Sequence, residues 1–127
     1  MSEAQTLVSE VQKLADRYVA VWNETDPAAR RKTIVELWAP DGQHYMGTIE
    51  ARGHEALEKR VSSSHEKNVK VGGNRFRPVG RAQALRNVVT FNWEMVSGSG
   101  EVASAGVGFL LLDDRGRISF DYLFALA

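Results

Sequence analysis

The hydrophobic period of this chain changes once, near residue 74, and this change constrains the fold more than any other feature. Before it, apolar residues recur at spacings of three and four, which is the period of an amphipathic helix. After it, apolar and polar residues alternate, which is the period of a half-buried strand. Helices followed by an antiparallel meander predict an α+β fold with the helices on one sheet face. The length of 127 residues predicts one domain, 1–127.

Three helices are predicted in the first half. The first has an apolar stripe that includes Tyr18 and Trp22. The second begins at Asp26 and Pro27, because Asp caps free backbone N–H groups and Pro suits the first helical position. A weaker third helix follows, and its polar tail, the serines at 62–64, is expected to fray.

Five strands are predicted, over residues 44–49, 75–79, 83–96, 101–112 and 117–126. The last one has apolar side chains on both faces, with Phe120 and Phe124 on one face and Leu123 on the other. Apolar residues on both faces imply cover on both faces, and three helices can cover only one. We therefore expect a homodimer through the outer sheet face. The alternative is that Phe120 and Phe124 are partly exposed or covered by a bent sheet edge.

Charge and cysteine content exclude several classes of function. The chain has 16 basic and 16 acidic residues, so neither a nucleic acid nor an anionic membrane surface is expected as a partner. Segment 67–86 has six basic residues and no acidic one, which we interpret as a solvated strand face rather than a nucleic-acid site. No apolar stretch approaches the ~18–20 residues of a membrane span. The lack of cysteine excludes thiol chemistry and favours a cytoplasmic location.

Metal and cofactor motifs are not expected either. His44, His54 and His65 are spaced by ten and eleven residues, which matches no compact metal motif. Gly106 and Gly108 lack the strand-to-helix context of a phosphate-binding loop. We therefore predict neither a metal nor a cofactor.

Three stretches carry a family resemblance. Residues 17–23 (RYVAVWN), 37–42 (LWAPDG) and 113–118 (DDRGRI) resemble motifs of the nuclear transport factor 2-like superfamily, in its SnoaL-like and ketosteroid isomerase-like branch. The resemblance extends over nearly the whole chain. It implies a cone: a curved antiparallel sheet wrapped around the N-terminal helices, with an internal pocket.

The same resemblance argues against steroid isomerisation. Tyr18 matches the tyrosine of that branch that donates a hydrogen bond to the substrate oxygen. However, the carboxylate base of those enzymes falls on Met46, and their second oxyanion donor falls on Gly108. A thioether and a glycine move no protons, so that mechanism is rejected.

The resemblance also implies which side chains point inward. Tyr18, His44 and Asp121 are the candidate catalytic residues, in a pocket whose expected substrate-binding residues are Trp22, Trp38, Met46, Phe91 and Trp93. Such apolar walls with a few polar groups are typical of a small-molecule site. His44 could take a proton while Asp121 orients it, or Asp121 could be the acid or base itself with a pKa raised by the apolar wall. The structural alternative is a buried pair that only satisfies its own hydrogen bonds.

We therefore expect a cofactor-independent acid–base enzyme of the isomerase, cyclase, dehydratase or hydrolase type. Its ligand would be a small apolar or aromatic molecule. Tyr18 would bind a substrate oxygen, or its hydroxyl would simply meet the backbone. The alternative is a non-catalytic ligand-binding or dimerising module with the same fold.

Overall fold

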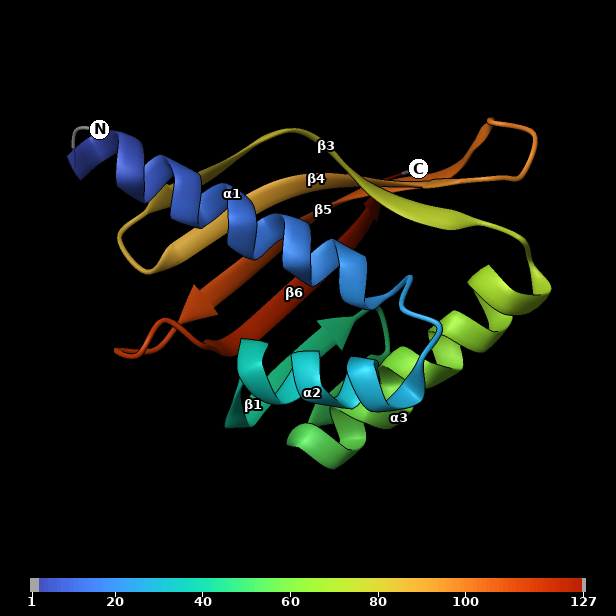
Figure 1. Ribbon diagram of the computed structural model, residues 1–127, viewed down its shortest axis with the longest axis horizontal. Helices are drawn as coiled ribbons and strands as arrows, with labels where there is room; N and C mark the ends of the chain where they lie inside the picture. Colours follow the sequence, from blue (N-terminus) through green and yellow to red (C-terminus); the bar gives the residue numbers. More distant parts are fainter. Residues whose placement is uncertain (1–2, 127) are drawn as a thin grey trace.

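The computed structural model describes residues 3–126 and has three helices on one face of a six-stranded sheet (Figure 1). The helices are α1 (Glu3–Val21), α2 (Pro27–Leu37) and α3 (His54–Ser64), and α3 continues as the π-helix η1 (His65–Val71). The strands are β1 (Trp38–Met46), β2 (Ile49–Arg52), β3 (Arg75–Leu85), β4 (Val88–Val96), β5 (Val102–Leu112) and β6 (Ile118–Leu126). Residues 1, 2 and 127 of the predicted domain lie outside the described residues.

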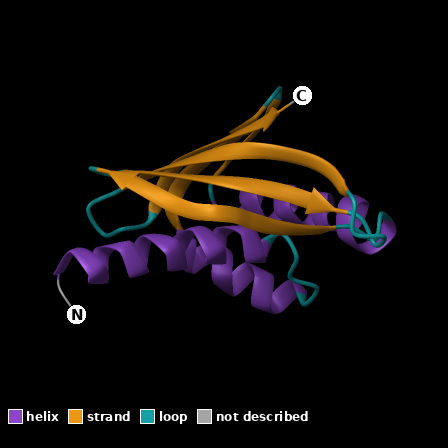
Figure 2. Cartoon of the chain, turned by 90° about the horizontal axis from the view of Figure 1, so that it is seen from above, coloured by secondary structure: helices purple, strands orange, loops and turns teal. Residues whose placement is uncertain are grey.

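The sheet is curved and open, with strand order β2-β1-β6-β5-β4-β3. Figure 2 shows the helices on one side of the sheet only, which confirms the predicted α+β arrangement. One pair differs from the antiparallel expectation, because β1 lies parallel to β6. This pair places His44 beside Asp121, although the two residues are 77 positions apart in the sequence. The mixed sheet therefore builds the polar centre of the molecule.

Several predicted strands have other bounds in the structure: 75–79 extends to Leu85 in β3, and residue 49 belongs to the separate strand β2. The predicted strand 83–96 is divided between β3 and β4 by a two-residue turn at Arg86 and Asn87. Arg86 has a φ of 54°, a conformation that usually favours glycine. The sequence has no glycine at this turn, so the turn could not be recognised from it. The predicted strand 44–49 begins earlier, at Trp38, because pairing of Trp38 with Ile118 extends it backward through a bulge.

The third helix does not fray at its serines. It continues through the buried Ser64 into η1, and Asn68 Nδ2 donates a hydrogen bond to Ser64 Oγ over 3.1 Å. The prediction of a frayed tail was wrong because Ser64 packs against the core instead of facing solvent. π-Helical turns are rare and often lie at functional sites.

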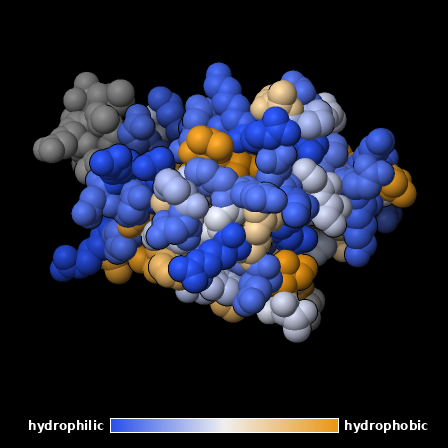
Figure 3. All heavy atoms as spheres, turned by 90° about the horizontal axis from the view of Figure 1, so that it is seen from below, coloured by the Kyte–Doolittle hydropathy of each residue, from blue (hydrophilic) through white to orange (hydrophobic). Residues whose placement is uncertain are grey.

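The two faces of the sheet have different surroundings. Val89, Phe91 and Trp93 of β4 are buried under the helices. No helix covers the opposite face (Figure 2). This face carries an aromatic patch formed by Phe109, Phe120, Tyr122 and Phe124, and Phe124 is 54% exposed. In contrast, the face on the side of α2 and α3, which Figure 3 shows from below, is mostly hydrophilic. No helix within residues 3–126 is long and apolar enough to span a bilayer.

Candidate active site

Asp121 is the centre of a buried polar cluster. Its Oδ1 accepts hydrogen bonds from the Tyr18 hydroxyl, over 2.9 Å, and from Nδ1 of His44, over 2.6 Å. Its Oδ2 accepts from the indole Nε1 of Trp38, over 2.8 Å. Three donors compensate the burial of a carboxyl group that has no exposed surface. Asp121 is therefore the shared acceptor of the cluster.

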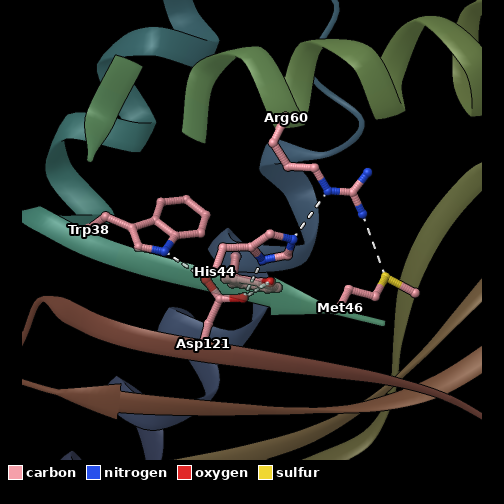
Figure 4. Close-up of polar contacts among 6 residues, drawn as sticks. Trp38, His44, Met46, Arg60 and Asp121 are labelled. Carbon is pink, nitrogen blue, oxygen red and sulfur yellow. Dashed lines mark hydrogen bonds and ion pairs between the residues drawn. The ribbon is translucent and has the colours of Figure 1, made fainter. Parts of the chain in front are cut away.

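The tautomer of His44 follows from its two partners (Figure 4). Arg60, which reaches down from α3, donates through Nε to His44 Nε2 over 3.2 Å. Because a guanidinium only donates, His44 Nε2 must accept, so the ring proton is on Nδ1 and points at Asp121. The arrangement is a neutral imidazole between a carboxylate and a guanidinium. It leaves His44 with a basic nitrogen on the side of Arg60.

Tyr18 is held in its protonated form. Its pKa is raised well above the ordinary value of 10.0, first by burial of the ring and then by the negative charge of Asp121 and the hydrogen bond to it. Arg60 and the indole of Trp22 lower the pKa of Tyr18 by smaller amounts. Tyr18 is thus a permanent hydrogen-bond donor to Asp121 at neutral pH, and its oxygen can accept another hydrogen bond.

Arg60 is a half-buried cation with weak partners. Apart from His44, its NH2 nitrogen donates to the thioether of Met46 over 3.5 Å, and its Cζ lies 5.2 Å from the ring centroid of Trp22. Burial lowers the pKa of Arg60, and electrostatic interactions with Tyr18 and Asp121 partly offset that effect. No carboxylate of the described residues lies within 4.0 Å of the guanidinium.

A cavity of about 210 Å³ lies between α1, α3–η1 and the sheet. Its apolar wall comes mainly from the sheet, and the residues of that wall include Phe76, Phe91, Trp93, Met95 and Leu123. Its polar lining residues include Tyr18, Arg60, Ser64, Asn68 and Ser104. An apolar cavity of ~150 Å³ suffices for benzene, so this one has room for a single ring with a short substituent.

The predicted site residues divide into two groups. Tyr18 and the expected substrate-binding residues Trp22, Met46, Phe91 and Trp93 line the cavity. His44, Asp121 and Trp38 do not line it, since all three are fully buried behind the wall. Tyr18, His44 and Asp121 nevertheless form one hydrogen-bonded cluster, with Tyr18 and Arg60 as its contacts with the cavity.

Sequence reasoning missed Arg60, Ser64 and Asn68, which all line the cavity from α3 and η1. Their spacing of four residues is the signal that could have identified them, because side chains four apart share one helix face. The polar serine tail was instead expected to fray. A polar helix face opposite an aromatic wall is recognisable only once the packing of α3 is known.

Two glycines explain how the aromatic wall fits against β5. Phe91 is paired with Gly108, and Trp93 with Gly106. A Cβ at Gly108 would lie 2.4 Å from Cζ of Phe91, and one at Gly106 would lie 2.4 Å from Cζ2 of Trp93. The rings therefore pack directly against bare backbone. Gly108 is the position where the ketosteroid isomerase resemblance expects an acid, and Phe91 occupies the space that such a side chain needs.

The three histidines have separate partners. His54 Nε2 lies 2.8 Å from the carbonyl oxygen of Trp38, and His65 Nδ1 lies 3.3 Å from that of Trp22. Among the residues whose side chains the structure describes, no three potential metal ligands of the His, Cys, Asp or Glu type lie close enough to hold an ion.

Solved structures show the same fold. No protein-family model matches the sequence, and no curated protein sequence does. A protein from Agrobacterium tumefaciens, proposed as an isomerase of the SnoaL-like family, is 24% identical with a TM-score of 0.85, covering 94% of this chain and 99% of its own. A proposed polyketide cyclase from Sinorhizobium meliloti is 14% identical, with a TM-score of 0.66. The match covers 87% of this chain and 93% of the cyclase chain.

A third similar structure is an NTF2-like protein from Exiguobacterium. It is 18% identical with a TM-score of 0.69, covering 89% of this chain and 98% of its own. The chain therefore has the nuclear transport factor 2-like fold that the sequence motifs predicted, in the form found in SnoaL-like proteins.

Proposed function

We propose that this chain, with its nuclear transport factor 2-like fold, is a cofactor-independent acid–base enzyme that acts on a small aromatic or apolar molecule. The observation that carries the proposal is the buried relay Asp121–His44–Arg60, which ends at the cavity wall. A carboxylate that holds Nδ1–H of a histidine leaves Nε2 as a base, and it stabilises the imidazolium that forms when Nε2 takes a proton.

In this mechanism His44 is the catalytic residue and Asp121 is a positioning residue. His44 Nε2 takes a proton from the substrate and returns it at another atom, as isomerisation, cyclisation and dehydration all require. Asp121 fixes the tautomer and the ring orientation from behind. Tyr18 offers its oxygen at the cavity wall, where it binds a hydroxyl or another donor of the substrate.

One movement precedes the proton transfer. In this structure Arg60 Nε faces His44 Nε2, so the guanidinium must turn into the cavity before Nε2 can reach a substrate. Arg60 can turn because it has a long side chain on α3 and its remaining partners are a thioether and an aromatic face. Both are weaker than an ion pair.

The test measures proton abstraction directly. Small aromatic ketones with an acidic C–H bond, some with a carboxylate and some without one, are incubated with the protein in D₂O, and deuterium incorporation is followed by proton NMR. We expect the wild-type protein to accelerate exchange and His44→Gln to lose the acceleration. Asp121→Asn should retain part of it, with an altered pH profile, because the imidazole is still present but is misoriented.

The matched control is Asp41→Asn, which removes an exposed carboxylate from the same strand as His44. It should leave exchange unchanged. Exchange by His44→Gln at the wild-type rate would contradict the proposal.

The second candidate is a non-catalytic binding module. It is favoured by one observation: His44 and Asp121 have no exposed surface and do not line the cavity. If the module is correct, cavity ligands bind tightly while no substrate of the panel is turned over, and His44→Gln changes neither result.

We also propose that two copies associate through the aromatic patch on the outer sheet face. Support comes from its ordered aromatic ladder, in which Tyr122 stacks on Tyr45 at 5.5 Å and on Phe120 at 6.4 Å between ring centroids. Exposed apolar patches of this kind often mark protein contacts. The cytoplasmic location expected from the lack of cysteine stays a prediction.

A further inference from the structure

The one charged residue among the described residues that line the cavity is Arg60. Its guanidinium has five N–H donors, and only two contacts use them: the ring nitrogen of His44 and the thioether of Met46. The nearest compensating carboxylate, Asp121, lies on the far side of the His44 ring. A half-buried cation in an apolar cavity is stabilised most by an anion that it can bind through two parallel hydrogen bonds.

Further polar groups follow Arg60 along the same helix face. Ser64 lies one turn on and Asn68 one turn beyond it, and both line the cavity. Asn68 donates to Ser64 Oγ, so the Ser64 hydroxyl proton is free to donate to a ligand. This polar stripe (Arg60, Ser64 and Asn68) faces the aromatic wall of β4 across the cavity.

Two indole N–H groups of the cavity also lack acceptors. Nε1 of Trp22 and Nε1 of Trp93 are buried without a hydrogen-bond partner, and both residues line the cavity. The indole of Trp22 lies close enough to the Tyr18 oxygen to lower its pKa, so Trp93 has the less compensated donor. The lining thus has an excess of donors, and only a ligand rich in acceptors can satisfy them.

We infer that the cavity selects a small aromatic acid, whose carboxylate binds Arg60 and the polar stripe while its ring packs against Phe91 and Trp93. The inference deepens the proposed function by naming the substrate class of the same cavity. A carboxylate matches the planar fork of a guanidinium. Binding of a carboxylate also draws the Arg60 guanidinium away from His44. Nε2 of His44 therefore becomes free when an acid is bound.

The test uses three ligands of one shape: benzoate, which is ionised at neutral pH, and the uncharged benzamide and toluene. Binding is measured by calorimetry and by quenching of tryptophan fluorescence. We expect benzoate to bind the wild-type protein at least about tenfold more tightly than either neutral compound. Arg60→Gln should weaken benzoate binding roughly 10- to 100-fold and change toluene binding little.

The matched control is Lys59→Gln, which removes the same charge from the neighbouring position of α3, where the side chain is exposed. It should leave benzoate binding unchanged. Arg60→Lys keeps the charge without the fork and serves as the second variant if Arg60→Gln does not fold. It should bind benzoate with intermediate affinity.

Three results would overturn the inference: no binding of benzoate to the wild-type protein, equal binding of toluene and benzoate, or wild-type affinity in both Arg60 variants. Failure of the proposed function has a different signature. In that case benzoate binds through Arg60 as expected, while His44→Gln has no effect on proton exchange.

Discussion

His44 Nδ1 lies 2.6 Å from Asp121 Oδ1, with both side chains fully buried, because β1 and β6 are neighbouring parallel strands of the sheet. The strand pairing thus positions the two residues on which the proposed proton transfer depends. Asp121 accepts three hydrogen bonds, and His44 links it to Arg60 at the cavity wall.

Asp121→Asn should lower the free energy of unfolding by about 1.5–3 kcal/mol, because it replaces the shared acceptor of three buried hydrogen bonds. An amide also places a donor where Tyr18, His44 and Trp38 already donate. Urea unfolding followed by circular dichroism measures the loss. Asp41→Asn, which changes an exposed carboxylate, should stay within about 0.5 kcal/mol of wild type. Equal stability of the two variants would contradict the buried cluster.

Tyr18 should make the stability of the protein fall at alkaline pH. Its folded-state pKa is raised above the ordinary value of 10.0, first by burial, so above pH 10 the unfolded chain releases a proton that the folded protein retains. The stabilisation is fully present below pH 10 and is lost as the pH rises further. Unfolding free energies measured from pH 8 to 11 should therefore fall more steeply in the wild-type protein than in Tyr18→Phe. Parallel pH profiles would show that Tyr18 is not buried beside a charge.

Gly106→Ala should destabilise the protein more than Gly108→Ala does. At Gly106 the new Cβ would lie 2.1 Å from the carbonyl oxygen of Phe124, which is backbone, whereas at Gly108 it meets the ring of Phe91. Overpacking of this kind typically lowers stability by about 1–3 kcal/mol. Thermal and urea unfolding of the purified variants measure the two effects.

Gly98→Ala is the control for these two variants, because its Cβ would have only one ordinary contact, at 3.7 Å. It should be close to neutral. A Gly106→Ala variant as stable as this control would contradict the close approach of Trp93 to β5.

The aromatic patch predicts a dimer in sedimentation velocity at micromolar concentration. Phe124→Glu should shift the protein toward monomer, because it introduces a charge at a 54% exposed aromatic position inside the patch. Leu85→Glu changes an even more exposed apolar residue, 78% exposed on β3, and should leave the dimer intact. A wild-type monomer at tens of micromolar would remove the dimer from the account.

Much of the fold was predictable because it depends on local patterns. The alternation over Val89, Phe91 and Trp93 identified the buried face of β4, and Asp26 caps α2 by accepting from the backbone N–H of Ala28, as its position predicted. The pairing of β1 with β6 is not local, so neither its direction nor the bulge near Pro40 could be derived from sequence pattern. The turn at Arg86 was missed because its positive φ is adopted without a glycine.

The candidate site was predictable only in part, for a related reason. The period of two placed His44 and Met46 on one face, and the family resemblance added Tyr18 and Asp121. The signal for Arg60 was weaker, since its spacing of four with Ser64 and Asn68 lies beside the apolar stripe of α3 that contains Leu57 and Val61. Its role depends on the distance between α3 and the sheet, which is a property of the packed structure.

Nitrogen-15 NMR of the histidine rings tests the central claim most directly. The claim is that His44 holds its proton on Nδ1 toward Asp121 and keeps Nε2 as a base. The chain has three histidines, so the His44 signals can be assigned from the spectrum of His44→Gln. At neutral pH the account predicts a protonated Nδ1 and an unprotonated Nε2 for His44, with this preference lost in Asp121→Asn. A proton on Nε2, or protons on both nitrogens, would contradict it.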